Sequence, residues 1–195
     1  NHQVLRGEQP VSASAIAAVY APNSETPRAL TEVEIQQIIQ DFAAATKRAI
    51  LAGFDGVELH GANTYLLQQF FSENSNQRTD QWGGSLEKRM TFPLAVINAV
   101  KTTIKENAAD QFILGYRISP EEIETPGIRL ADSLTFAQTI KPLISYLHLS
   151  MGSYQRTSLN NQDDKTPLLN QFADVTNHEL PLIGIGSVET PTDAE

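Results

Sequence analysis

The chain has 195 residues, of which 41% are hydrophobic and 19% charged, a composition typical of one globular domain with a hydrophobic core and not of a disordered chain. Its formal net charge of −9 opposes binding to nucleic acid or to an anionic membrane, and no apolar run is long enough for a transmembrane helix. The chain contains no cysteine, which excludes disulfides and thiolate metal sites within it and favours a cytoplasmic protein. We predict no metal site.

The apolar residues predict helices that alternate with short strands. Prolines interrupt residues 1–30, which we expect to form a loop region. The capping-box pattern of Thr31–Glu34 then begins an amphipathic helix that Gly53 should end. We expect strands at Phe54–His60, Phe112–Arg117, Ile144–Ser150 and Pro181–Gly186, and helices at Leu86–Glu106 (irregular near Pro93), Leu130–Leu143, Pro167–His178 and from Pro191, behind the N-cap Thr190. This alternation predicts βαβ units, a parallel sheet and an α/β fold.

Polar or small residues stand where the four predicted strands end. These residues are His60, Arg117, Ser150 and Gly186. In α/β barrels the active site is built at the carboxyl ends of the strands. Because apolar strands do not need polar side chains there in order to fold, these positions are candidates for function.

One long segment carries a specific motif. It reads GFDGVELHGANTYLL over 53–67, FFS over 70–72 and NQRTDQWGGS over 76–85. In this pattern the chain resembles the Old Yellow Enzyme family of FMN-dependent NADH:flavin oxidoreductases. The segments PVSASAI (10–16), RISP (117–120) and IGIGS (183–187) follow in family order, so the resemblance covers almost the whole chain.

The resemblance implies a (β/α)8 TIM barrel, of which residues 1–195 would form about the fourth to seventh β/α units as a single partial domain. The first three strands, and the eighth strand with its phosphate-binding arginine, would then belong to a longer protein. A half-barrel has two unpaired sheet edges and one uncovered face. We expect this face to be apolar and to favour self-association, for example as a homo-oligomer, through Val57, Leu59, Ile113, Leu147, Ile183 and Ile185.

His60, Asn63 and Tyr65 are the candidate catalytic residues. Two hydrogen-bond donors three residues apart in the loop after a strand can converge on one substrate oxygen. The alternative is a histidine satisfied by its neighbours and a turn-forming asparagine. The resemblance assigns His60 and Asn63 to the carbonyl or nitro oxygen of the acceptor, and Tyr65 to proton donation. For Tyr65 the alternative is an aromatic ring packed under the barrel rim.

Arg117 is the first of the candidate cofactor-binding residues. The resemblance places it beside the pyrimidine end of FMN, where a permanent cation stabilises the anionic reduced flavin. The alternative is an ion pair with a neighbouring carboxylate, either Glu58 or Glu121.

A second group is implied at the flavin phosphate. Backbone N–H groups at glycine-rich turns after strands can cradle an anion. The residues that the resemblance assigns to this cradle are Ser150, Gly152, Gly186 and Ser187.

Other polar residues of the motif are interpreted as structural. Arg78 and Asp80 should brace the loop that follows the histidine strand, and Gly83 and Gly84 should adopt positive φ angles. The remaining histidines have no partner pattern and are interpreted as incidental: His2, His148 and His178.

The favoured hypothesis is an FMN enzyme that NADH or NADPH reduces and that passes hydride to an α,β-unsaturated carbonyl or similar small molecule. One alternative is a flavin-free, phosphate-binding barrel enzyme, which would need a lysine at a strand end, and none is present. Another is an inactive, self-associating fragment. A related subtype, the dienoyl-CoA reductase branch, carries an iron–sulfur cluster whose cysteines would lie beyond residue 195.

Overall fold

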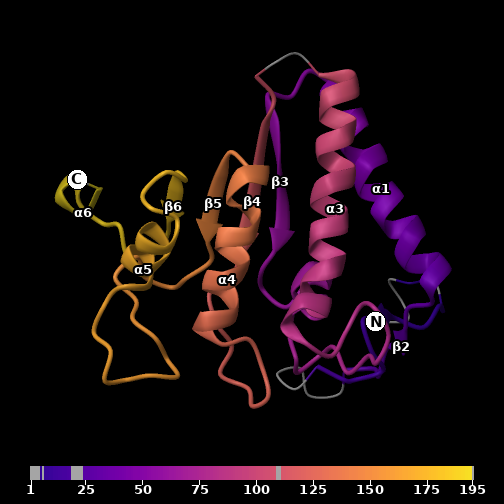
Figure 1. The fold of residues 1–195 in the computed structure, drawn as a ribbon, viewed down its shortest axis with the longest axis horizontal. Helices are drawn as coiled ribbons and strands as arrows, with labels where there is room; N and C mark the ends of the chain where they lie inside the picture. The colour runs from indigo at the N-terminus through magenta and orange to yellow at the C-terminus, as the bar shows by residue number, and fades with distance from the viewer. Residues whose placement is uncertain (1–4, 6, 19–23, 109–110, 195) are drawn as a thin grey trace.

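A parallel four-stranded sheet forms the centre of the molecule, with the strand order β3-β4-β5-β6 (Figure 1). The computed structural model describes residues 5, 7–18, 24–108 and 111–194. The strands are β3 (Gly56–Gly61), β4 (Ile113–Ile118), β5 (Tyr146–Leu149) and β6 (Leu182–Gly184). The alternation of strand and helix therefore confirms the predicted βαβ units and parallel sheet.

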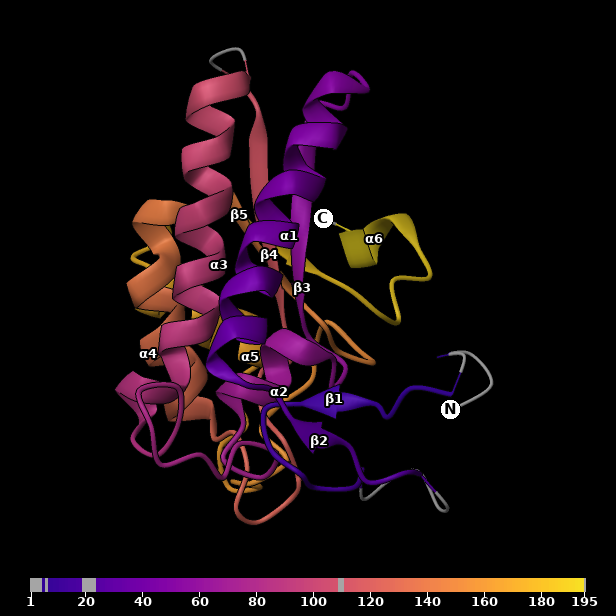
Figure 2. The same cartoon turned by 90° about the vertical axis from the view of Figure 1, so that its right-hand side faces the viewer.

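The longer helices cover one face of the sheet (Figures 1 and 2): α1 (Glu32–Leu51), α3 (Leu86–Asn107), α4 (Leu130–Ile140) and α5 (Leu168–Val175), with α3 packed against α1. Helices α3, α4 and α5 connect consecutive strands, whereas the short α6 (Pro191–Ala194) follows β6 and lies on the other side of the sheet in Figure 2. No helix within the described residues is long and apolar enough to cross a membrane.

The ends of α1 follow the sequence signals. The Thr31 hydroxyl accepts a hydrogen bond from the Glu34 N–H, and the Glu34 carboxylate accepts one from the Thr31 N–H, which completes the predicted capping box. Gly53 has a φ of +85°, a conformation in which a side chain would be strained, and it follows the last turn.

Three of the predicted helices differ in detail. Helix α5 ends at Val175 and not at the expected His178. Helix α3 continues through Pro93, where we expected an irregularity. Helix α4 ends at Ile140, earlier than expected, and a 3₁₀ turn, η1 (Lys141–Leu143), takes over around Pro142. A proline lacks the N–H that the next helical hydrogen bond needs, which accounts for the change.

Three short elements were not predicted. Strands β1 (Val11–Ser12) and β2 (Arg28–Ala29) pair in parallel within the expected loop region, and helix α2 (Leu66–Phe71) follows β3. Elements of two and six residues are too short for a periodic pattern to reveal. Helix α2 contacts both β1 and β3, so the N-terminal strands lie near the carboxyl end of β3 (Figures 1 and 2).

The two faces of the sheet differ in polarity. Successive side chains of a strand point to opposite faces, and the apolar set, including Leu59 at 4% and Leu147 at 0% exposure, packs against the helices. The prediction that these two leucines lie on a bare face was therefore wrong. Ile113 and Ile183 do lie on the open face, at 45% and 40% exposure.

Candidate active site

The open face of the sheet is polar at its carboxyl end. His60 of β3 is the register partner of Arg117 in β4, and Arg117 is in turn the register partner of His148 in β5. Three cationic or titratable side chains thus stand in one row across neighbouring strands. Each is partly buried.

The loop after β3 has an unusual backbone. Asn63 and Thr64 both have positive φ angles, 55° and 64°, a region that few residues other than glycine adopt. Hydrogen bonds hold this loop: the Asn63 N–H donates to the Ser119 hydroxyl at 3.0 Å, and the Thr64 N–H donates to the Gln68 side chain at 3.0 Å. Strained backbone of this kind persists where the surroundings fix it, and it is frequent at active sites.

Tyr65 follows as the N-cap residue of α2. Its ring centroid lies 5.3 Å from that of His60, with the rings tilted by 51°. The Tyr65 side chain is largely exposed, at 62%. Within the described residues the ring thus contacts His60 but is not buried.

A chain of hydrogen bonds joins Arg117 to Asn63. The Arg117 Nη2 donates to the Ser150 hydroxyl at 3.0 Å, and that hydroxyl donates to Asn63 Oδ1 at 2.9 Å. The three residues come from the ends of three neighbouring strands. Three of the predicted site residues are thereby in direct contact.

Arg117 does not form the ion pair that was its alternative role. Glu58 pairs with His148, and the buried Glu121 pairs with Arg156. The Arg117 Nε is buried and has no hydrogen-bond partner within the described residues. A buried donor of this kind normally has a partner, so its orphan state is consistent with a ligand at this position.

Glu58 and His148 form a second contact on the open face. His148 Nδ1 lies 3.0 Å from Glu58 Oε2. Burial, together with the hydrogen bond to Glu58 and the charge of its carboxylate, raises the pKa of Tyr146 to about 12. The Tyr146 ring lies over Gly115 of the neighbouring strand. Glycine is needed there, because a Cβ on Gly115 would lie 2.1 Å from the ring. His148 thus has a partner that the sequence pattern did not reveal.

The environment of His60 favours its neutral form. Burial first, and the Arg117 charge second, lower the pKa of His60, while the Glu58 carboxylate opposes them. An imidazole with a lowered pKa is neutral at pH 7 and offers one N–H donor.

The proposed phosphate cradle lies after β5 and β6. Gly186 has a φ of +89°, and a Cβ on it would lie 2.4 Å from the Gly152 carbonyl oxygen. The Ser187 hydroxyl contacts that same carbonyl at 3.4 Å, and the Tyr154 N–H donates to the Gly186 carbonyl at 3.0 Å. The two loops therefore approach each other so closely that only glycine fits at 186. A Cβ built on Gly152, in contrast, would have no other atom within 4 Å and would point into open space.

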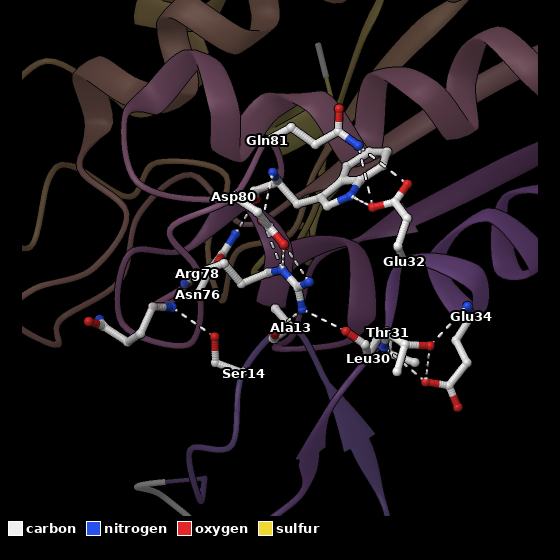
Figure 3. A network of polar contacts seen from close by, with 12 residues as sticks. Ala13, Ser14, Leu30, Thr31, Glu32, Glu34, Asn76, Arg78, Asp80 and Gln81 are labelled. Atoms are coloured by element: carbon white, nitrogen blue, oxygen red, sulfur yellow. Dashed lines mark hydrogen bonds and ion pairs between the residues drawn. The ribbon is translucent and has the colours of Figure 1, made fainter.

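Arg78 and Asp80 brace the long loop after α2, as predicted (Figure 3). The Arg78 Nη1 donates to the carbonyl oxygens of Ala13 at 3.0 Å and Leu30 at 2.7 Å, and its Nη2 pairs with Asp80 at 2.6 Å. This arginine ties the N-terminal strands to the loop. Gly84 has the expected positive φ, of 100°.

Gly83 has a different reason to be glycine. A positive φ was expected there, but φ is positive only at its neighbour Gly84. A Cβ on Gly83 would instead lie 2.4 Å from the Asn76 side chain, so close packing requires glycine at this position.

Sequence reasoning did not single out Ser119, and it considered Glu58 only as a partner of Arg117 and not of His148. Ser119 lies two residues beyond Arg117, and Glu58 lies two residues before His60. A period of two places Glu58 on the same face as His60, which was the signal available. Of the incidental histidines, the exposed His178 contacts Asp174 at 3.1 Å, and His2 lies outside the described residues. The described residues contain no cluster of three potential metal ligands.

Comparison with known proteins gives consistent matches. The sequence profile of the NADH:flavin oxidoreductase / NADH oxidase family matches residues 2–195. The chain is 46% identical to an NADH:acrylate oxidoreductase of Vibrio harveyi, over 100% of this chain and 20% of that protein. It is also 46% identical to an NADH:fumarate oxidoreductase of Klebsiella pneumoniae (strain 342), over 99% of this chain and 21% of that protein.

Among solved structures, morphinone reductase in complex with tetrahydroNAD is similar, with a TM-score of 0.70 and 32% sequence identity. The similarity covers 94% of this chain and 51% of the morphinone reductase chain. The chain thus spans about a fifth of the length of the two sequence relatives and about half of this structure. The neighbour is a TIM barrel, so the described sheet and helices form part of such a barrel.

Proposed function

The chain belongs to the NADH:flavin oxidoreductase / NADH oxidase family, and on that premise we propose that the protein is an FMN-dependent oxidoreductase. It would take electrons from NADH or NADPH and reduce an α,β-unsaturated carbonyl compound or a similar small molecule. The observation that carries the proposal is the hydrogen-bonded chain from Arg117 through Ser150 to Asn63, which lies beside a neutral His60.

The residues present fit a flavin. The buried, unpartnered Nε of Arg117 is a donor available to the pyrimidine ring, and the open space beside Gly152 would admit a phosphate. We therefore propose that Arg117 and Ser150 lie near the ring, and that Gly152, Gly186 and Ser187 lie near the phosphate. Bound FMN would supply the hydride for the acceptor.

His60 and Asn63 would hold the acceptor. The neutral imidazole donates one N–H, and the Asn63 amide donates a second hydrogen bond to the same oxygen. Two such donors stabilise the negative charge that builds on a carbonyl oxygen as hydride adds to the conjugated carbon. They also fix the orientation of the acceptor above the open face.

Tyr65 would complete the reaction by giving a proton to the second carbon of the reduced double bond. A phenol is neutral at pH 7 and can act as the acid. The exposed position of Tyr65 next to the His60 ring supports this role, because the hydroxyl can reach a bound acceptor.

A second function is favoured by the lengths of two relatives. In the NADH:acrylate and NADH:fumarate oxidoreductases, the matched segment is only about a fifth of the protein. If the acceptor is reduced elsewhere in such a protein, the barrel serves only to oxidise NADH. In that case loss of the Asn63 donor would leave overall turnover intact.

The experiment uses the full-length protein. It should be yellow and release FMN on denaturation. With His60→Ala and Asn63→Ala, the flavin should stay bound and be reduced by NADH normally, whereas reduction of an enone such as 2-cyclohexenone should fall by about 10²- to 10³-fold. Unchanged enone reduction in both variants would refute the acceptor site, and a colourless protein would refute the flavin.

A further inference from the structure

Asn63 is held at two points by serines from the neighbouring strand ends. The Ser119 hydroxyl, just beyond β4, accepts the Asn63 N–H at 3.0 Å, and the Ser150 hydroxyl, just beyond β5, contacts Asn63 Oδ1 at 2.9 Å. The backbone contact secures a residue whose φ is 55°. The side-chain contact has a separate consequence.

The direction of the side-chain hydrogen bonds follows from chemistry. An arginine has only donors, so the Ser150 oxygen must accept from Arg117 Nη2. The serine hydrogen is left to donate, and the acceptor that it contacts among the described residues is Asn63 Oδ1, at 2.9 Å. Only the amide oxygen can receive this hydrogen, so the contact places Oδ1, and not Nδ2, against Ser150.

The Asn63 amide is thereby fixed in one orientation. With Oδ1 turned toward Ser150, Nδ2 points away from it, and nothing within the described residues accepts a hydrogen bond from Nδ2. The NH₂ group is free to donate to a ligand. Without the serine, the amide could turn by 180° and present its oxygen, which would repel the oxygen of an acceptor.

We propose that Ser150 is a positioning residue. It accepts a hydrogen bond from Arg117 and donates one to Asn63 Oδ1, and it thereby holds the Asn63 NH₂ group toward the acceptor oxygen. The inference rests on the proposed function, because it assigns a partner to one of the two acceptor-binding residues. It gives Ser150 a role in acceptor binding in addition to the one proposed for it beside the flavin.

The test uses the full-length, FMN-loaded protein and 4-hydroxybenzaldehyde as the probe, followed by the change in flavin absorbance. Ser150→Ala should weaken probe binding roughly three- to tenfold, the usual effect of losing one hydrogen bond. Ser145→Ala is the matched control. It removes a serine hydroxyl that accepts the Leu114 N–H at the opposite end of the same strand, and it should leave the affinity unchanged.

A double-mutant cycle separates positioning from a general structural effect. In an Asn63→Ala background, Ser150→Ala should cause no further loss of affinity, because the serine acts through the missing amide. If Ser150→Ala folds poorly, the pair Ser150→Thr and Ser150→Val gives the same answer. Threonine keeps the hydroxyl and should keep the affinity, and valine, of the same shape, should lose it.

Three results would overturn the inference: unchanged affinity in Ser150→Ala, losses that simply add in the double variant, or loss of FMN from Ser150→Ala while Ser145→Ala stays loaded. The last result would assign Ser150 to the cofactor alone. Failure of the proposed function would look different, since Asn63→Ala by itself would then bind the probe as the unaltered protein does.

Discussion

His60 in β3 and Arg117 in β4 are register partners, so a permanent positive charge lies beside the imidazole on the open face of the sheet. Burial is the larger cause and this charge the second cause of the lowered pKa of His60. Glu58, two residues earlier on the same strand, acts in the opposite direction. The pKa of this candidate catalytic residue therefore depends first on burial and then on neighbouring charges, to which His148 adds a smaller lowering effect.

Replacing the two charged neighbours should move the His60 pKa in opposite directions. Arg117→Met removes a repelling cation and should raise it, whereas Glu58→Gln should lower it further. NMR titration of the His60 ring protons measures both, with Lys101→Gln, far from this site, as the control. In the unaltered protein the midpoint should lie below the ordinary value of about 6.5.

The lowered pKa of His60 also determines how its contribution to stability depends on pH. Because the folded state resists protonation of His60, the unfolded state binds the proton first as the pH falls. The contribution of neutral His60 to folding is thus fully present above about pH 6.5 and is lost as the pH falls below it. A midpoint at or above 6.5 would contradict the assignment of burial and Arg117 as the dominant causes.

Tyr65→Phe should slow only one half of the reaction. Reduction of the flavin by NADH needs no proton from the phenol and should keep its rate. Enone reduction should slow by about 10²- to 10⁴-fold, the usual contribution of a positioned acid. Stopped-flow measurement of each half-reaction separates the two, and equal slowing of both would indicate that the Tyr65 hydroxyl serves the fold.

Local signals in the sequence predicted much of the fold. The capping box at Thr31, the glycine at 53 and the short apolar runs marked the boundaries of α1 and β3 to within a few residues, because caps and periodicity act locally. The face of the sheet that the helices cover could not be predicted in this way. Alternation shows which residues share a face, but only the packing of the helices determines whether the face that holds Leu59 is buried.

For the candidate site, the motif and the positions of the strand ends predicted Arg117, Ser150 and Asn63 as separate site residues. Their hydrogen-bonded chain was not predicted, because it spans residues 63 to 150 and depends on how three strand ends stand side by side. The pairing of Glu58 with His148 was missed for the same reason: it joins two strands that are not sheet neighbours.

Gly186→Ala should weaken flavin binding by at least about tenfold, a free-energy change of about 1.4 kcal/mol. The new Cβ would collide with the Gly152 carbonyl at 2.4 Å and push the two loops apart. Gly53→Ala is the matched control, since Gly53 also has a positive φ but no atom within 4 Å of a Cβ. Both variants bear the strain of the left-handed backbone, so fluorescence titration with FMN should separate them. Equal affinities would remove the Gly186 loop from the cofactor site.

Arg78→Ala should destabilise the protein far more than Arg28→Ala. The Arg78 side chain is 12% exposed and donates to the carbonyl oxygens of Ala13 and Leu30, two residues that are themselves buried. Its removal leaves both carbonyls without this partner, and we expect a loss of about 3 kcal/mol in the free energy of unfolding.

Arg28 is the control because it also forms a bidentate ion pair, with Glu34, but in an exposed position, where water and salt screen the interaction. Urea denaturation of the full-length protein, followed by circular dichroism, compares the two variants. Arg78→Lys should lie between them, because an ammonium group keeps the charge opposite Asp80 but cannot reach both carbonyls in the planar geometry of a guanidinium. If Arg78→Ala cost no more than Arg28→Ala, the loop after α2 would have to be held by its other contacts, chief among them the hydrogen bond from the Trp82 indole to Glu32.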